Sequence, residues 1–394
     1  MKPTKLLAIG TAFAMGMLLM PGCGDSGQPL SSSVSSSTTQ DGSSASSSSA
    51  PPRTGPVAID MKNDVGVTVN FPGKIDDDTV QLLKGSGITY VRLVFSYPFG
   101  TDGVTPNAAY LMTKKTARRF YDAGIKVMAQ SFWPGGRGYD DQTGTIKWFS
   151  NLPGFYNDFD DDYFYKTVKT ATKFMAEDLK DICSTWLISN EIDINTYTGD
   201  MTFDQIIRYV KAATDGVRTG NPESSCGVNL LTEVWEAYSL KFVNALYGEN
   251  PTLDWLGLDG YYGTLQQGGP ETWEHYITTF SEAAKVPIVI TEWSYSSAES
   301  DPLGTCKFHW EGHGGARGPQ TQAEYVTACM EVFARHPEIV GTLWYALHDQ
   351  DEVCWECGDP RCTLYSSWGL LNVDGSPKPA LAAMDKATGL LHNR

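Results

Sequence analysis

The sequence is short of positive charge. It has 30 Lys and Arg residues against 46 Asp and Glu residues, which gives a formal net charge of −16. A chain of this sign repels nucleic acid and other polyanions, so the composition excludes them as partners. The acidic surface indicates little more, because acidic surfaces also keep many proteins in solution.

The N-terminal apolar run is too short for a bilayer. Residues 6–20 are uncharged and fall short of the roughly 20 residues that a membrane span needs. The run follows Lys2 and Lys5 and precedes Gly22 and Cys23, which is the order of an export signal and its processing site, with a membrane span as the alternative. We predict a signal peptide over residues 1–22, whose removal takes away two lysines and leaves a net charge of −18.

The junction resembles a bacterial lipobox, from which Met20 and Pro21 depart. The resemblance implies cleavage before Cys23, lipidation of its thiol and a location at the outer membrane or cell surface. Residues 31–52 are almost entirely Ser, Thr, Ala and Pro, a composition that cannot bury enough apolar surface to fold. We interpret residues 23–56 as a flexible tether and residues 57–394 as one domain, which we expect to be monomeric.

Short β-branched or apolar runs alternate with longer amphipathic segments in that domain. The predicted strands are 65–71, 90–96, 126–131, 185–190, 227–232, 255–260, 287–291 and 340–346. The predicted helices are 113–123, 163–181, 203–219, 272–284, 321–335 and 379–388. Eight such units predict an α/β fold with a single (β/α)8 barrel, with an open doubly wound sheet as the alternative.

A barrel of this class has its active site at the C-terminal ends of its strands. Polar and aromatic residues at those ends include Arg92, Asn190, Glu191, Asp259, Tyr261, Tyr262, Glu292, Trp293, Trp344 and His348. Glu191 and Glu292 end the fourth and seventh strands, so they are expected to face each other across the barrel mouth. Two such carboxyl groups, one protonated and one ionised, are what retaining glycoside hydrolysis needs. The alternative for each is a helix cap or a surface ion pair.

Four segments in this order resemble glycoside hydrolase clan A, whose members are retaining β-glycosidases on this barrel. They are TWLISNEID (185–193), DWLGLDGYYG (254–263), VPIVITEW (286–293) and WGLLNVDGSPKPAL (368–381). The third looks like the clan's nucleophile strand, and the second is similar to galactanase and mannanase segments, as in families 53 and 5. The resemblance implies that Glu191 is the acid/base and Glu292 the nucleophile.

The same resemblance implies the roles of three neighbouring residues. Asn190 would bond the sugar 2-hydroxyl, while Arg92 and Tyr261 would keep Glu292 ionised, because a cation and a phenol donor favour a carboxylate. A structural ion pair is the alternative for Arg92. Strand alternation decides between Tyr261 and Tyr262, which point to opposite faces.

Aromatic residues and one further acid complete the predicted substrate site. Trp344 resembles the clan's platform under the reacting sugar, with core packing as the alternative. Trp133, Trp293 and His348 are further candidates for substrate binding. Glu233 lies near the end of the fifth strand, where it could rival Glu191 or bind substrate.

Seven cysteines remain once Cys23 is assigned to lipid, so an exported domain should contain disulfides and one unpaired thiol. Cys183 and Cys226 each precede a neighbouring strand, and we predict a disulfide between them. Cys329 falls within a helix and is the candidate for the unpaired, buried thiol. The remaining cysteines are Cys306, Cys354, Cys357 and Cys362, and a zinc site formed by the last three with His309 or His313 is the alternative to disulfides.

These observations predict an exported glycoside hydrolase that cleaves β-linked polysaccharide of the mannan, glucan or galactan type by endo action. No cofactor or metal is expected, and the membrane is a partner only through the lipid anchor. The alternatives are a non-catalytic glycan-binding protein of the cell surface, and an exo-acting or transglycosylating enzyme of the same clan.

Overall fold

The computed structural model describes residues 55–140, 145–150, 159–232, 236–299, 310, 317–350 and 361–392. Several sequence predictions lie outside these residues, namely the signal peptide, the lipidated Cys23, nearly all of the tether, and Glu233, Cys306, His309, His313, Cys354 and Cys357. Among the described residues, no helix combines the length and the apolar character needed to span a membrane.

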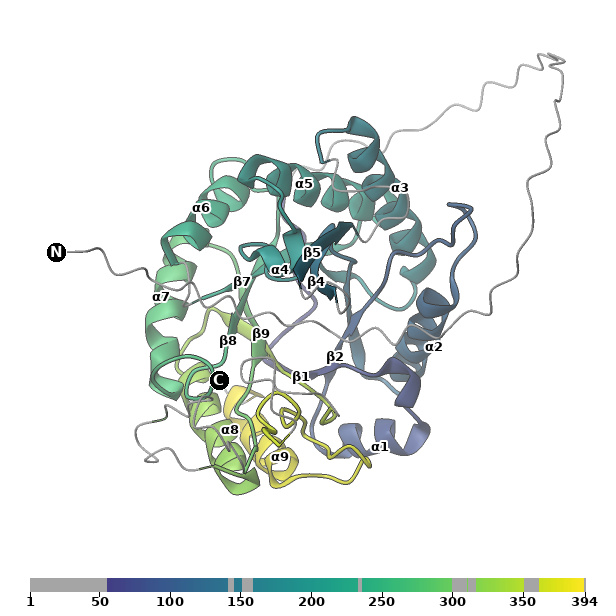
Figure 1. Cartoon of the computed structure of the whole chain (residues 1–394). Coiled ribbons are helices and arrows are strands. Elements are labelled where there is room, and N and C mark those ends of the chain that lie inside the picture. Colours follow the sequence, from purple (N-terminus) through teal and green to yellow (C-terminus); the bar gives the residue numbers. More distant parts are fainter. Residues whose placement is uncertain are drawn as a thin grey trace, which may run out of the picture. The chain divides into compact units, whose positions relative to one another are not determined.

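Parallel strands form a closed barrel in the order β1-β10-β9-β8-β7-β6-β3-β2 (Figure 1). The strands are β1 (Asp64–Val69), β2 (Tyr90–Val94), β3 (Lys126–Gln130), β6 (Thr185–Leu187), β7 (Ser225–Leu231), β8 (Trp255–Gly260), β9 (Ile288–Trp293) and β10 (Ile339–Trp344). All eight predicted strands are confirmed. The pairing of β1 with both β10 and β2 closes the sheet, so the open doubly wound alternative is wrong.

Helices surround the strands, as a (β/α)8 barrel requires (Figure 1). They are α1 (Asp77–Gly85), α2 (Ala108–Asp122), α3 (Asp162–Leu179), α5 (Phe203–Gly220), α6 (Glu236–Tyr247), α7 (Trp273–Ala284), α8 (Pro319–Phe333) and α9 (Pro379–His392), with the short α4 (Asn195–Thr198) and the 3-10 turns η1 (Pro72–Lys74) and η2 (Pro270–Thr272). Polar caps fix where several begin. Thr202 and Gln205 form a reciprocal capping box at the start of α5, for example.

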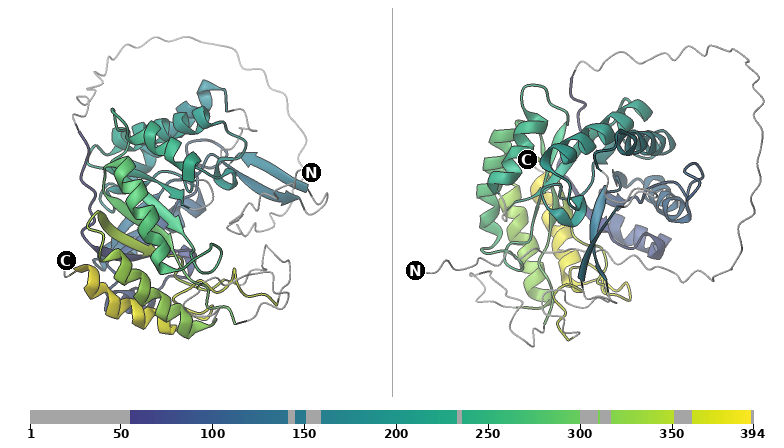
Figure 2. Two further views of the ribbon diagram at one scale, coloured as in Figure 1. Left: turned by 90° about the vertical axis from the view of Figure 1, so that its left-hand side faces the viewer. Right: turned by 45° about the horizontal axis from the view of Figure 1, so that its top comes forward.

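A hairpin of β4 (Gly135–Asp140) and β5 (Thr145–Ser150) follows the C-terminal end of β3 (Figure 2). The sequence analysis did not predict this hairpin. It is inserted between β3 and α3, at the end of the barrel where the active site is expected.

The inside of the barrel has two chemically different layers. The lower layer is a cluster of large apolar side chains, Tyr90, Met128, Leu187, Trp255, Val289 and Leu343. Gly227 makes room for this layer, because a Cβ there would lie 2.3 Å from the Trp255 ring. Since side chains two residues apart share a face of a strand, the next inward positions begin an upper layer, which includes Arg92, Gln130 and Tyr345.

A β-bulge in β9 determines which of its side chains enter the barrel. Ile290 pairs with Leu258, but Glu292 pairs with the next residue, Asp259, so Thr291 is an extra residue on this strand. As a result Thr291 and Glu292, although adjacent, both project into the upper layer. Trp293 then points outward against Phe333 of α8.

The predicted disulfide between Cys183 and Cys226 is wrong, and strand register gives the reason. Cys226 is the pairing partner of Trp186, so Cys183 lies three residues away along the strand direction. That is about 10 Å, whereas bridged cysteines have Cα atoms within about 7 Å. Cys183 is a free thiol whose pKa burial raises to about 12. Cys329 in α8 is buried and outside any disulfide, as predicted.

Candidate active site

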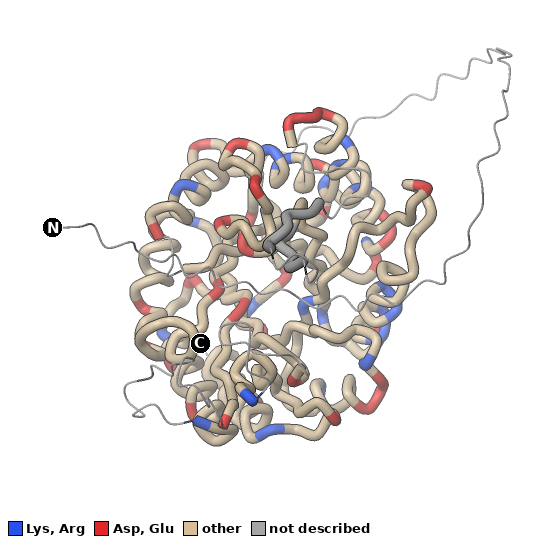
Figure 3. The backbone as a smooth tube through the Cα atoms, viewed as in Figure 1, with Lys and Arg blue, Asp and Glu red and all other residues tan. Residues whose placement is uncertain are grey.

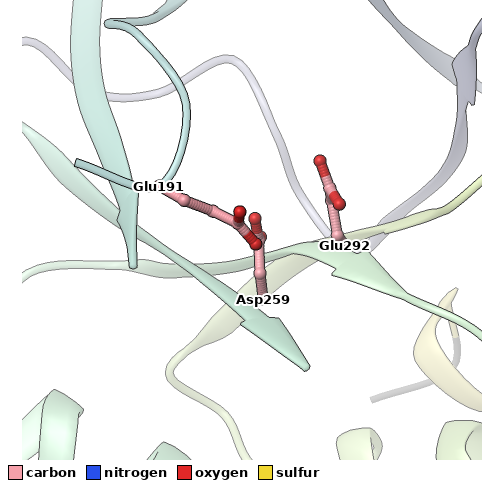
Figure 4. Close-up of side chains that lie close together, drawn as sticks. All are labelled: Glu191, Asp259 and Glu292. Carbon is pink, nitrogen blue, oxygen red and sulfur yellow. The ribbon is translucent and has the colours of Figure 1, made fainter. Parts of the chain in front are cut away.

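Glu191, Asp259 and Glu292 come together at the C-terminal end of the barrel (Figure 4). A carboxylate oxygen of each lies within 4.8 Å of the other two. Glu191 follows β6, Asp259 lies in β8 and Glu292 in β9, and all three side chains are buried. The structure therefore brings the two predicted catalytic glutamates together and adds a third acid to which the sequence analysis gave no role.

Glu292 is held by two donors from opposite sides of the barrel. The guanidinium of Arg92 donates to Oε1 and the phenol of Tyr261 donates to Oε2. Both contacts were predicted, and both favour the ionised carboxylate. Tyr262 points away from the mouth, stacks on Tyr276 and bonds Thr232, so alternation selects Tyr261.

Glu191 lies in an environment that favours its proton. Burial, the negative charge of Glu292 and the nearby Asp259 and Asp193 raise the pKa of Glu191 well above its usual range, against the opposing effect of Arg92. The two glutamates thus differ in their surroundings: Glu292 accepts from Arg92 and Tyr261, whereas Glu191 lies among acidic groups.

The backbone around Glu191 is strained. Ser189 and Glu191 have positive φ angles of 67° and 33°, a region that residues other than glycine rarely adopt. The Glu191 N–H donates to Oδ1 of Asn229 at 2.8 Å, which holds this conformation in place. The strain aims the Glu191 side chain at the other two carboxyl groups.

Asn190 is fixed through its side-chain oxygen. Its Oδ1 accepts from Nε2 of Gln130 at 3.2 Å and from Nδ2 of Asn229 at 3.1 Å. Its amide nitrogen is therefore the group that remains to donate towards a ligand. Gln130 ends β3, and the sequence analysis gave this residue no role.

The predictions that Trp293 and Trp344 bind substrate are wrong for the same reason. Trp293 and Trp344 contact each other with ring centroids 4.9 Å apart, and both have 0% exposure. They belong to the outer core between strands and helices, whereas Leu343 belongs to the inner cluster. The inward neighbour is Tyr345, which packs edge-on against Tyr261. Neither tryptophan can offer a ring face to a sugar.

Trp133 and His348 lie at different parts of the rim. Trp133 is half-buried and packs edge-on against Tyr197 of α4, whose pKa burial and the charges of Glu191 and Glu292 raise. This places an aromatic wall beside the carboxyl groups. His348 exchanges two backbone hydrogen bonds with the Asn70 side chain, and its own substrate role stays a prediction.

The residues missed by sequence analysis are Asn229, Asp259, Thr291, Tyr197 and Tyr345. Asn229 had one available signal: it is a polar residue inside the apolar run of β7 (SCGVNLL). Asp259 was noted at its strand end without a role. Thr291 depends on the bulge in β9 and Tyr197 on the segment after β6, neither of which has a local sequence signal, and Tyr345 depends on which face of β10 points inward.

Arg92 compensates part of the negative charge in the acidic cluster. Arg92 is buried against Glu292, whose attraction raises the pKa of Arg92 against its burial. The absence of a metal ion at the three acids stays a prediction. Acidic residues also surround the barrel, with basic residues interspersed among them (Figure 3).

The fold is shared with solved glycoside hydrolases. A family 39 enzyme from the gut symbiont Bacteroides cellulosilyticus WH2 is 17% identical with a TM-score of 0.58, and the match covers 84% of this chain and 64% of that one. A GH5_18 protein from Streptomyces cattleya in complex with GlcNAc is 17% identical with a TM-score of 0.61, covering 85% and 81%. The GH53 catalytic domain of Ignisphaera aggregans is 16% identical with a TM-score of 0.56, covering 84% and 98%.

The present chain thus spans less than two thirds of the length of the family 39 protein. No protein-family model and no curated protein sequence matches it. At these identities the likeness shows a common fold, the (β/α)8 barrel.

Proposed function

We propose that this chain is a retaining glycoside hydrolase that cleaves β-linked polysaccharide by endo action. The observation that carries the proposal is the pair Glu191 and Glu292. Their oxygens approach within 4.8 Å, Glu292 accepts hydrogen bonds from Arg92 and Tyr261, and burial raises the pKa of Glu191. Retaining enzymes hold their carboxyl groups about 5–5.5 Å apart, whereas inverting enzymes need about 6.5–9.5 Å to admit a water molecule.

The arrangement supports a double displacement. Glu292 attacks the anomeric carbon while Glu191 gives its proton to the departing glycosidic oxygen, which leaves a glycosyl ester on Glu292. Forming the ester consumes the negative charge of Glu292 that helped to keep Glu191 protonated. Glu191 can then take a proton from water, whose oxygen attacks the anomeric carbon and releases Glu292.

Neighbouring residues support sugar binding at this position. The free amide nitrogen of Asn190 would donate to the 2-hydroxyl of the reacting sugar, and Trp133 beside Tyr197 offers a partly exposed ring to an apolar sugar face. Solved proteins with this fold include glycoside hydrolases of families 5, 39 and 53, one of them in complex with GlcNAc. Mannans, glucans and galactans are the proposed substrate class.

Azide rescue of two variants tests the chemistry. In Glu292→Ala no ester can form, and azide should enter the vacated space and give a product of inverted configuration. In Glu191→Ala the ester should form from dinitrophenyl glycosides and accumulate, and azide should give a product of retained configuration. Product stereochemistry is measured by proton NMR, and inversion by the wild-type enzyme would contradict the proposal.

The substrate is tested with the purified domain and a panel of β-mannans, β-glucans, β-galactans and xylans. Endo action should release a range of oligosaccharides from the start of the reaction. Release of monosaccharide alone would indicate exo action instead of endo action. Longer products in the presence of acceptor sugars would show transglycosylation. Saturable binding without turnover would favour a non-catalytic glycan-binding protein.

We also propose that the chain is a lipoprotein anchored through Cys23. The Gly22-Cys23 junction supports this anchor. The Ser-rich tether that follows it would place the barrel near large polymers at the cell surface. Full-length protein should enter the detergent phase on Triton X-114 partitioning, and Cys23→Ser should move it to the aqueous phase. A variant that stays in the detergent phase would contradict the anchor.

A further inference from the structure

Asp259 is a third carboxyl group for which the double displacement has no use. It is fully buried and lies within 4.8 Å of Glu191 and Glu292. Its Oδ2 accepts from Nδ2 of Asn229, and its Oδ1 contacts the hydroxyl of Thr291.

The hydrogen bonds around Thr291 are compatible with a proton on Asp259. The Thr291 hydroxyl contacts Oδ1 of Asp259 and lies 3.4 Å from the Leu258 carbonyl, and it has one proton to donate. With Asp259 ionised, Thr291 donates to Oδ1. With Asp259 protonated, Oδ1 donates to the Thr291 oxygen, and the Thr291 proton can turn to the Leu258 carbonyl.

The crowding of acidic groups favours the protonated form of Asp259, because carboxylate oxygens of Glu191, Asp259 and Glu292 lie within 4.8 Å of one another. The titratable groups that face Asp259 are Arg92 of β2, Glu191 after β6, Tyr197 of α4, Tyr261 after β8 and Glu292 of β9. Arg92 is the cation among them, and it is bonded to Glu292. Burial and the charge of Glu292 raise the pKa of Asp259 well above its usual range.

Asn229 connects Asp259 to the catalytic acid. One side-chain N–H of Asn229 is directed to Asp259 and the other to Asn190, so its oxygen has to face the N–H of Glu191. That bond holds the strained backbone at Glu191. Loss of the Asp259 acceptor would let the Asn229 amide turn and release Glu191.

We propose that Asp259 is a positioning residue that stays protonated in the working enzyme and, through Asn229, fixes the backbone that aims Glu191. The inference rests on the proposed function only for its kinetic test. A neutral acid suits this position because it supplies the acceptor for Asn229 and the donor for Thr291 without placing a second negative charge beside Glu292.

Asp259→Asn and Asp259→Leu distinguish the hydrogen bonds that the Asp259 side chain makes from the charge that it carries. Asparagine can accept from Asn229 and donate to Thr291, as the protonated acid does, so Asp259→Asn should leave the basic limb of the kcat against pH profile in place. Asp259→Leu removes the acceptor, and it should lower kcat by about ten- to hundredfold, displace the basic limb and change KM little. If Asp259 were ionised, Asp259→Asn would move the basic limb to lower pH, which would overturn the proposal.

A double-mutant cycle tests the route through Asn229. Asn229→Ala should lower kcat to a similar extent as Asp259→Leu, and the double variant should be little worse than either, because both act on one contact. Additive losses would overturn the proposed route. The matched control is Asp254→Asn, since Asp254 lies just before the start of the same strand, buried and bonded to the Val57 and Cys226 N–H groups. It should lower the melting temperature and leave the kcat against pH profile unchanged.

A spectroscopic measurement separates failure of this inference from failure of the proposed function. In protein labelled at the Asp carboxyl carbon, one resonance should remain at the protonated position at pH 7.5 and disappear in Asp259→Asn. The wild-type protein needs no substrate for this experiment. A spectrum with all Asp residues ionised at pH 7.5 would overturn the proposal even in an active glycosidase.

Discussion

The two layers inside the barrel use the same strands for opposite purposes. Tyr90 and Arg92 are two residues apart on β2, as are Leu343 and Tyr345 on β10 and its continuation. The lower layer buries apolar rings and branched chains, which stabilises the fold. The upper layer crowds three carboxyl groups around Arg92, which costs stability. Strand geometry therefore determines where a side chain lies inside the barrel, and the residue type determines whether that side chain stabilises the fold or forms part of the candidate site.

Glu191→Gln should give the largest effect and is the sharpest test of the upper layer. Glutamine cannot transfer the proton, so kcat for substrates with poor leaving groups should fall by about 10²- to 10⁴-fold. The basic limb of the pH profile should disappear with it. Steady-state kinetics between pH 4 and pH 9 measure both, and a retained basic limb would remove Glu191 from the role of acid.

The same variant should be more stable than the wild type at pH 8. The folded-state pKa of Glu191 is raised, so above the unfolded-state pKa the unfolded chain releases a proton that the folded chain keeps, and wild-type stability falls as pH rises. Glutamine removes this penalty and should raise the melting temperature by a few degrees at pH 8, with little gain at pH 4. An equal gain at both pH values would contradict the electrostatic explanation.

Leu343→Ala is the corresponding test of the lower layer. Truncating a fully buried leucine should lower the free energy of unfolding by about 2–5 kcal/mol. Because Leu343 faces Tyr90 and Trp255 rather than the carboxyl groups, the pH profile of kcat should keep its shape at temperatures where the variant is folded. Urea unfolding and kinetics on one preparation check both parts. A shifted pH profile would contradict the conclusion that the lower layer does not affect the chemistry of the upper layer.

Trp133→Ala and Trp344→Phe compare a rim aromatic with an outer-core one. Loss of the half-buried Trp133 should raise KM about tenfold, equivalent to about 1.4 kcal/mol, and change the melting temperature little. Trp344→Phe loses the bond from Nε1 to the Trp368 carbonyl, so it should lower the melting temperature and leave KM unchanged. The reverse pattern would restore Trp344 as the sugar platform.

Cys183→Ser should have the smallest effect. A lost native disulfide typically costs 2–5 kcal/mol, whereas replacing a buried free thiol should change the free energy of unfolding by about 1 kcal/mol. The peptide that contains Cys183 should be alkylated in unfolded, non-reduced protein. Recovery of that peptide crosslinked to the one that contains Cys226 would contradict the structure.

The eight strands, the barrel class and the pair Glu191 and Glu292 could all be predicted from the sequence. Strand and helix periodicity is a local property of the sequence. A carboxylate that follows a short apolar run can therefore be assigned to a strand end from the sequence alone. Arg92 and Tyr261 were predicted from resemblance and alternation, and the structure places both on Glu292.

Other features were decided only by tertiary structure. The bulge at Thr291 turns Glu292 inward and Trp293 outward, and it exists because β9 pairs with β8, which is distant in sequence. Strand register likewise separates Cys183 from Cys226, and the pairing of β7 with both β6 and β8 brings Asn229 and Asp259 to Glu191. Local sequence determines which residues form strands, but pairing between strands determines which side chains meet, because register and bulges depend on both partners.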